Sequence, residues 1–178
     1  MALAGDDRTY LVGLGSNVRH FRFGAPAEVL RAAVHALAQE PGITLVAASP
    51  IVASAPLGPS RRRYANAAAI VETALEPPAL LARLQSMEAR FGRRRRGQRW
   101  RARVLDLDII LWSGGPWASP GLVIPHPAFR HRAFVLAPAA AIAPTWRDPL
   151  SGLSLRQLRA RLARPRPPAP LARPSARG

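Results

Sequence analysis

Apolar residues recur along the chain at two spacings, and these spacings predict its strands and helices. In TYLVGLGSN, residues 9–17, they alternate up to Gly15, which predicts a strand that runs into a loop. Over residues 27–39 they recur every three or four positions, which predicts an amphipathic helix. Residues 43–49 predict a second strand, and residues 50–63 have the proline, glycine and serine content of a long loop.

The later part of the chain continues the same pattern. A strand is predicted over residues 64–75 and a helix from Pro77 until Gly92. Residues 103–112, RVLDLDIILW, predict another strand, and helices are expected over residues 130–136 and 154–162. The order β-α-β-β-α-β predicts an α+β fold with one mixed or antiparallel sheet and helices packed on it.

The length and composition indicate one domain. The chain has 178 residues, of which 48% are hydrophobic, and we expect residues 1–163 to form a single domain. Residues 164–178 are rich in proline and arginine and poor in apolar side chains, which predicts a disordered tail. Because no long apolar run or secretory signal pattern occurs, we expect a cytoplasmic protein without membrane contact. Cysteine is absent, so any metal must be bound by oxygen or imidazole.

The charge is strongly positive and comes entirely from arginine. The formal net charge is +16, with 26 basic residues, none of them lysine, against 10 acidic ones. Such a charge attracts polyanions, and a non-enzymatic RNA-binding module is therefore one candidate. GC-rich coding bias explains the arginine excess equally well, and we expect no specific nucleic-acid partner.

Two acidic residues interrupt the apolar strand over residues 103–112. Side chains two apart on a strand share a face, so Asp106 and Asp108 should point the same way, with apolar residues from Leu105 to Leu111 packed behind them. Neighbouring carboxylates repel one another unless a cation lies between them. A rigid Asp-x-Asp pair therefore suits magnesium-bound ATP, although an ordinary solvent-facing strand could also have two acidic residues.

An arginine-rich stretch, RRRRGQRWRAR, immediately precedes this strand. Cations beside a metal-binding pair suit a triphosphate, whereas the simplest alternative is a solvated loop. The chain has no GxxxxGK[ST] motif, and GLGSN lacks the GxGxxG spacing. Phosphate binding would therefore depend on arginine and metal. A different metal-dependent nucleotidyltransferase is a second candidate.

Several short motifs together carry a resemblance to one family. In chain order they are GLGSN, SAPLG (54–58), YAN (64–66), GRRRR before RW, RVLDLDIILW and IPHPAFRHRAFVLAP. This ordered set, over about residues 9–144, resembles the 6-hydroxymethyl-7,8-dihydropterin pyrophosphokinases of folate biosynthesis. The resemblance implies a ferredoxin-like βαββαβ core with long mobile active-site loops. It also implies transfer of an intact pyrophosphoryl group from MgATP to the pterin hydroxymethyl group, with release of AMP.

The resemblance also implies roles for individual residues. The catalytic set is Arg93, Arg103, Asp106 and Asp108, of which the two aspartates bind two magnesium ions. The ATP-binding set is Glu88, Arg93, Trp100, Arg103, Ile109, His126 and Arg132. The pterin-binding set is Ser54, Ala55, Leu57, Tyr64, Asn66, Trp100 and Phe134. Aromatic faces and an amide suit a flat heterocycle with an amino and oxo edge.

Pattern alone gives some of these residues other roles, and the chain departs from the family in places. Glu88 should face solvent from the flank of its helix, whereas Tyr64 and Phe134 equally fit core aromatics. Arg101 and Ala102 replace a usual Gly-Pro, so the resemblance does not extend to the closing of the arginine loop. No general base can be assigned. The expected partners are the two small substrates, and we expect a monomer.

Overall fold

The computed structural model describes residues 8–54, 64–92 and 104–164. The strands are β1 (Arg8–Ser16), β2 (Thr44–Ala48), β3 (Val52–Ser54), β4 (Tyr64–Thr73), β5 (Asp106–Trp112), β6 (Trp117–Ser119) and β7 (Leu122–Ile124). The helices are α1 (Pro26–Ala38), α2 (Pro77–Arg90), the 3-10 turn η1 (Phe129–His131), α3 (Ala133–Ile142) and α4 (Leu155–Ala163). Within this part of the chain, no helix is long and apolar enough to span a membrane.

One five-stranded antiparallel sheet forms the centre of the fold. Its strand order is β2-β4-β1-β5, and β3 pairs with the first residues of β4. The central strands β1 and β4 pair along their whole lengths, whereas β5 forms one edge. This is the ferredoxin-like β-α-β-β-α-β arrangement that the sequence predicts.

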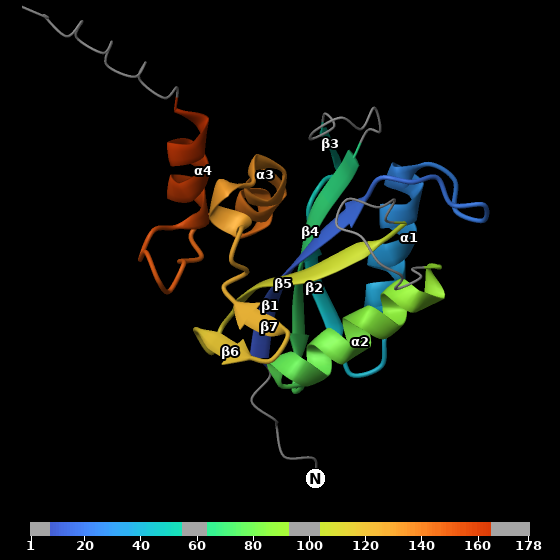
Figure 1. The fold of residues 1–178 in the computed structure, drawn as a ribbon, viewed down its shortest axis with the longest axis horizontal. Helices are drawn as coiled ribbons and strands as arrows, with labels where there is room; N and C mark the ends of the chain where they lie inside the picture. The colour runs from blue at the N-terminus through green and yellow to red at the C-terminus, as the bar shows by residue number, and fades with distance from the viewer. Residues whose placement is uncertain (1–7, 55–63, 93–103, 165–178) are drawn as a thin grey trace, which may run out of the picture.

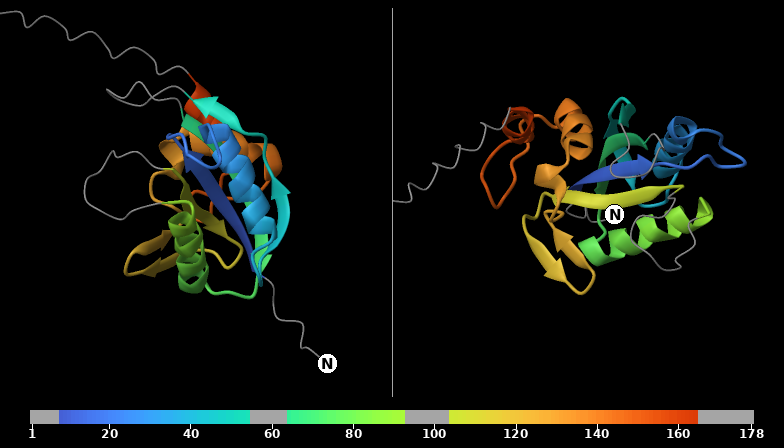
Figure 2. Two further views of the ribbon diagram at one scale, coloured as in Figure 1. Left: turned by 90° about the vertical axis from the view of Figure 1, so that its right-hand side faces the viewer. Right: turned by 45° about the horizontal axis from the view of Figure 1, so that its top comes forward.

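Helices cover both faces of the sheet, as Figures 1 and 2 show. On one face α1 and α2 pack on side chains that include Tyr10, Val12 and Leu14. On the other face α3 and α4 pack around Leu11, and the core there includes Phe129. Because both faces are buried, β1 is apolar on both sides, with glycines in place of larger side chains at two positions towards its end.

Strand β5 contains a β-bulge that corrects one expectation. Val12 pairs with Ile109 and Leu11 with Leu111, so Ile110 is an extra residue in β5. Ile110 and Leu111 consequently both pack with the α3 and α4 core, whereas Leu107 and Ile109 pack with the α1 and α2 core. The expectation that Leu111 lies behind the aspartates together with Leu107 is therefore wrong.

The other elements are close to the sequence predictions, with three differences. Val52–Ser54 form strand β3, where a loop was expected, because they pair with the start of β4. Trp117–Ser119 and Leu122–Ile124 form a hairpin that the pattern did not predict. Helix α3 begins after Arg132 and continues through Pro138, because its apolar residues are buried against the sheet. The predicted tail lies outside the described residues from position 165 onward.

Candidate active site

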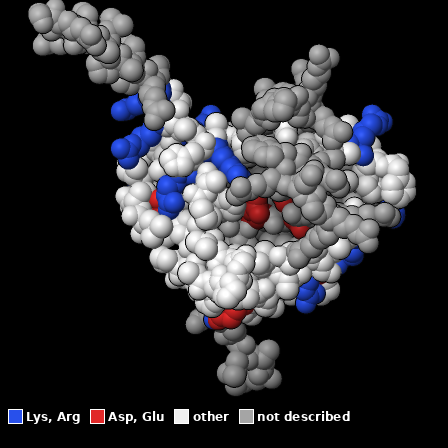
Figure 3. Space-filling view, in the orientation of Figure 1, with Lys and Arg blue, Asp and Glu red and all other residues white. Residues whose placement is uncertain are grey.

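The aspartates of β5 lie side by side along one face of the strand. Asp106 and Asp108 are partly exposed, and they alternate with the buried Leu107 and Ile109. Their β1 partners are Gly15 and Gly13, so both carboxylates are on the sheet face that α3 and α4 cover in part. Figure 3 shows acidic side chains in a hollow near the middle of the molecular surface in that view. The predicted shared face is confirmed, and the strand presents both carboxylates to solvent from a rigid support.

Asn66 approaches Asp106 across Gly15. Gly15 pairs with Asp106 on one side and with Asn66 on the other, so all three residues form one row across β5, β1 and β4. A β-carbon on Gly15 would lie 3.7 Å from Oδ1 of Asn66 and 4.0 Å from Cβ of Asp106. The absence of a side chain at Gly15 therefore leaves a space bordered by an amide on one side and a carboxylate on the other.

Glu88 is buried behind the same strand. Its exposed fraction is 2%, and its Oε1 accepts a hydrogen bond of 2.7 Å from the backbone N–H of Leu107. The solvent-facing position that the helix pattern predicts is therefore wrong. Glu88 lies four residues after the buried Leu84, which is the spacing of the buried side of α2. Pattern analysis missed this burial because it assigned a charged side chain to solvent.

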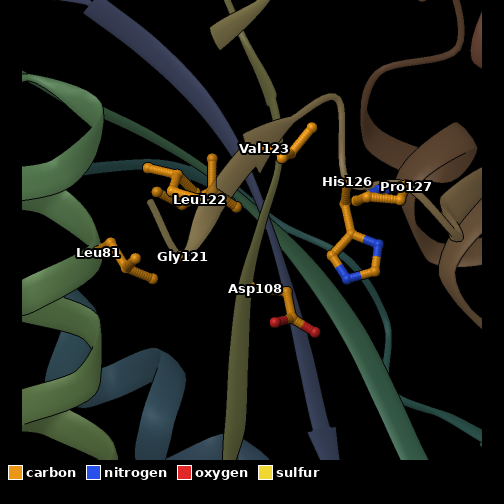
Figure 4. Close-up of a pocket in the computed structure, with 8 residues that line it drawn as sticks. Leu81, Asp108, Gly121, Leu122, Val123, His126 and Pro127 are labelled. Carbon is orange, nitrogen blue, oxygen red and sulfur yellow. The ribbon is translucent and has the colours of Figure 1, made fainter. Parts of the chain in front are cut away.

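The position of His126 is fixed by backbone hydrogen bonds. Its N–H donates to the carbonyl of Ile110 at 3.0 Å, which attaches the segment after β7 to the outer edge of β5. Its Nδ1 accepts the backbone N–H of Ala128 at 3.2 Å. The neutral ring therefore carries its hydrogen on Nε2, which makes Nε2 a donor. Figure 4 shows the His126 ring and the Asp108 carboxylate directed towards the same space.

That space is a pocket of about 310 Å³ beside the edge of β5. Its lining residues are Leu81 from α2, Asp108 and Ile109 from β5, Gly121, Leu122 and Val123 around β7, and His126 with Pro127. The walls are largely apolar, and Asp108 and His126 are the polar side chains among the residues that line the pocket. Sequence analysis missed Leu81 and Val123, because only the tertiary fold brings α2 and the hairpin next to β5.

Arg132 and Phe134 lie together at the start of α3. Arg132 occupies the N-cap position of that helix, and its guanidinium carbon is 5.8 Å from the centre of the Phe134 ring. Both side chains are partly exposed. Figure 3 shows arginine side chains on the α3 and α4 side of the acidic hollow. A cation and an aromatic face are therefore available next to each other at this end of α3.

A buried ion pair anchors the turn that precedes Arg132. Nε and Nη2 of Arg130 donate to the carboxylate of Asp148 at 2.7 and 2.5 Å, and Asp148 has an exposed fraction of 0%. Burial alone would raise the pKa of the Asp148 carboxyl, but hydrogen bonds from Arg130 and Ser151 outweigh burial and lower the pKa to about 2. The pair joins η1 to the segment that leads into α4.

The structure describes only some of the remaining predicted site residues. Tyr64 begins β4 and pairs with Ser54 at the end of β3. Tyr64 and Phe134 belong to different elements, β4 and α3. Five predicted site residues lie outside the described residues, namely Ala55, Leu57, Arg93, Trp100 and Arg103.

The donor set of β5 fits magnesium. Asp106 and Asp108 offer carboxylate oxygens, which are hard ligands of the kind that magnesium prefers. Over residues 8–54, 64–92 and 104–164 there is no group of three or more histidine, aspartate or glutamate side chains that could hold a metal ion. A pair of carboxylates leaves most of an octahedral coordination shell to water and substrate oxygens, as is usual for magnesium that binds together with a nucleotide.

Comparison with known proteins agrees with this geometry. The sequence model of the family described as 7,8-dihydro-6-hydroxymethylpterin-pyrophosphokinase (HPPK) matches residues 11–144. The 2-amino-4-hydroxy-6-hydroxymethyldihydropteridine pyrophosphokinase of Synechocystis is 38% identical over 148 residues, which cover 83% of this chain and 73% of that protein. The enzyme of the same name from Methylorubrum extorquens is 43% identical over 138 residues, 77% of this chain and 83% of that protein.

A solved structure shares the fold. The wild-type HPPK-DHPS of Plasmodium falciparum with SDX-DHP superposes with a TM-score of 0.66 over 90% of this chain, at 11% sequence identity. This chain spans 45% of that longer protein. At such low identity the similarity concerns the fold alone.

Proposed function

The chain belongs to the family of 7,8-dihydro-6-hydroxymethylpterin-pyrophosphokinases. We propose that its β5 aspartates bind magnesium together with ATP. The enzyme is an ATP-dependent diphosphotransferase of folate biosynthesis. It transfers a pyrophosphoryl group from ATP to the hydroxymethyl group of 6-hydroxymethyl-7,8-dihydropterin, and AMP is released. The family membership disfavours both a different nucleotidyltransferase and a non-enzymatic RNA-binding module.

One observation carries the proposal for the metal site. Asp106 and Asp108 share a partly exposed face of a strand whose other side is buried in the core. Magnesium bound between these carboxylates and the phosphates would neutralise charge on the transferring group and fix its orientation. We propose two such ions. The rigid strand keeps the two carboxylates in a fixed relation, so little reorganisation is needed when the nucleotide binds.

The pocket beside β5 suits the nucleoside part of ATP. Apolar side chains of Leu81, Leu122 and Ile109 line it, and a purine ring is a flat group that gains from burial against such walls. The Nε2 hydrogen of His126, at the polar end of the pocket, is placed to donate to a phosphate oxygen. Arg132 supplies a permanent positive charge for the same purpose.

We propose that the pterin binds on the side of the aspartates that faces β1 and β4, opposite the pocket beside the outer edge of β5. Asn66 lies across Gly15 from Asp106, and its side-chain amide can both donate to and accept from the amino and oxo edge of a pterin. Tyr64 and Phe134 offer aromatic faces to the flat ring. A pterin held there would have its hydroxymethyl group directed towards the phosphates that the aspartates hold.

The transfer is then an in-line displacement at phosphorus. The hydroxymethyl oxygen forms a bond to the β-phosphorus of ATP, the bond from that phosphorus to the α-phosphate oxygen breaks, and AMP leaves with that oxygen. The hydroxymethyl proton is released to solvent. Positioning and charge neutralisation account for most of the rate, so no side chain is assigned as general base.

The other predicted site residues are part of the same proposal. Arg93 and Arg103 would bind phosphate oxygens, and Trp100 would contact both substrates. The SAPLG segment would border the pterin through Ser54, Ala55 and Leu57. We also propose that the enzyme acts as a cytoplasmic monomer, which gel filtration and cell fractionation can test.

The reaction products test the proposed function. Purified protein with magnesium, ATP and 6-hydroxymethyl-7,8-dihydropterin should form AMP and the pterin diphosphate in equal amounts, as measured by ion-exchange chromatography. ADP as the sole nucleotide product would indicate transfer of a single phosphoryl group and would contradict the proposal. Omitting the pterin should abolish AMP formation, which controls for simple hydrolysis of ATP.

A further inference from the structure

Strand β5 is the edge of the sheet, and among the described residues no strand pairs with its outer backbone groups. Two contacts from outside the sheet take the place of such a strand. The N–H of Leu107 donates to Oε1 of Glu88 at 2.7 Å, and the carbonyl of Ile110 accepts from the N–H of His126 at 3.0 Å. One of these hydrogen bonds lies before Asp108 in the sequence and the other lies after it. The backbone of β5 is therefore held at its outer edge before and after Asp108.

From this arrangement we infer that Glu88 is a positioning residue for the metal-binding strand, and that it acts through the backbone of Leu107. The inference rests on the proposed function, because it assigns to Asp106 and Asp108 the binding of magnesium and ATP. The earlier expectation, drawn from the family resemblance, is that Glu88 binds ATP. In the structure Glu88 supports the strand that would hold ATP.

Because it is buried, this hydrogen bond is important for the position of the backbone at Leu107. Glu88 is 2% exposed and the N–H of Leu107 is buried with it, so water cannot replace the carboxylate as the acceptor. A buried donor without an acceptor is strongly disfavoured. Loss of the acceptor would consequently leave the N–H of Leu107 unpaired until the backbone around it moves.

Movement of Leu107 would displace both metal ligands. Asp106 and Asp108 are its immediate neighbours in the chain, and any rotation of the Leu107 peptide groups changes the direction of both carboxylates. Metal sites require ligand positions that are correct to within about 0.5 Å. Glu88 therefore affects the magnesium affinity while it lies on the α2 side of the strand.

Two substitutions separate this role from direct contact with ATP. Glu88→Gln keeps a side-chain oxygen that can accept from Leu107 but removes the charge. Glu88→Met keeps a similar volume and removes the acceptor. Calorimetric titration with magnesium and α,β-methylene-ATP, in which a methylene group replaces the bridging oxygen of the bond that breaks, measures binding independently of turnover.

A second buried glutamate gives a matched control. Glu40 follows α1, its side chain is 7% exposed, and Arg83 and Arg90 bind its carboxylate. Glu40→Met removes a buried acceptor at a place that has no contact with β5 backbone groups. Thermal unfolding of all three variants identifies any general loss of stability, so a specific effect at β5 can be recognised.

We expect magnesium-dependent binding of α,β-methylene-ATP to weaken about tenfold or more in Glu88→Met, as is typical when a residue that orients metal ligands is lost. Binding should stay within about threefold of wild type in Glu88→Gln, which keeps an oxygen acceptor for Leu107, and in Glu40→Met, which leaves Glu88 in place. Unchanged affinity in Glu88→Met, or an equal loss in Glu88→Gln, would overturn the inference.

Hydrogen exchange gives a result even where Glu88→Met does not fold. The Leu107 amide of the wild-type protein should exchange slowly and should stay protected in Glu88→Gln, whereas exchange at the rate of an exposed amide would overturn the inference. Failure of the proposed function would give a different result from failure of the Glu88 inference. In that case the wild-type protein itself would show no magnesium-dependent binding of the nucleotide analogue.

Discussion

The backbone N–H of His126 donates to the carbonyl of Ile110, two residues after Asp108, at 3.0 Å. This bond fixes the histidine next to the aspartate, and both side chains line one pocket. The proposed metal ligand and the proposed hydrogen-bond donor to phosphate thereby belong to one rigid unit. The proposed catalytic geometry depends on the edge strand β5 and on the segments that hold its outer edge.

Replacement of Asp108 should abolish most of the activity without unfolding the protein. Asp108→Ala should lower kcat by about three orders of magnitude, because a metal that neutralises transition-state charge contributes several kcal/mol. The side chain is partly exposed, so its loss leaves no cavity in the core. AMP formation and circular dichroism measure the two effects. Glu28→Gln, an exposed acid on α1, is the control, and near-normal turnover of Asp108→Ala would contradict its metal role.

Removal of the His126 ring should weaken ATP binding more than it slows the reaction. His126→Ala loses one donor to a phosphate, which corresponds to about tenfold in KM for ATP for a hydrogen bond to a charged group. The expected change in kcat is smaller. Steady-state kinetics with varied ATP tests this, with His35→Ala on the exposed side of α1 as the control. An unchanged KM would show that His126 does not contact the nucleotide.

Filling the space at Gly15 should block substrate binding. The side chain of Gly15→Val would occupy the gap between Asn66 and Asp106. Overpacking of this kind costs about 1–3 kcal/mol, so we expect pterin affinity to fall about tenfold or more, as measured by fluorescence titration. Ala48→Val introduces the same side chain at an exposed position of β2 and should leave affinity unchanged. Normal pterin binding by Gly15→Val would place the pterin elsewhere.

The Arg130–Asp148 pair predicts a pH dependence of stability. The pKa of the Asp148 carboxyl falls from 3.8 to about 2 on folding, so the pair stabilises the protein above pH 3.8 and loses this contribution as the pH falls towards 2. Asp148→Asn should lower the free energy of unfolding at pH 7 by about 3–5 kcal/mol, because it leaves Arg130 without its buried counter-charge.

Urea unfolding of both proteins between pH 7 and pH 2 tests this pair. The difference in unfolding free energy between wild type and Asp148→Asn should be constant down to about pH 4 and then shrink. A difference that stays constant down to pH 2 would contradict the lowered pKa of Asp148. Because other carboxyl groups titrate in both proteins alike, the difference isolates this group.

Local patterns predicted the orientation of the β5 aspartates better than the surroundings of the strand. The alternation of Asp106 and Asp108 with apolar residues is a property of the strand itself, so sequence was sufficient to place both on one face. The extra residue Ile110 could not be foreseen, because a bulge depends on pairing with β1. For the same reason Leu111 was placed on the wrong side.

Long-range contacts explain the other differences. Glu88 was expected in solvent because helix periodicity does not reveal that a strand backbone needs an acceptor. The pocket joins Leu81 of α2 with Val123 of β7, which are far apart in sequence. The pair of Asn66 and Asp106 across Gly15 depends on strand order, which element prediction leaves undetermined.

Metal binding by the β5 aspartates is the claim on which the rest depends. Titration of manganese, followed by electron paramagnetic resonance in the presence of α,β-methylene-ATP, measures it directly. Wild-type protein should bind manganese together with the nucleotide, and the double variant Asp106→Asn, Asp108→Asn should not, although it still binds the pterin. Equal manganese binding by the wild type and the double variant would contradict the proposed site.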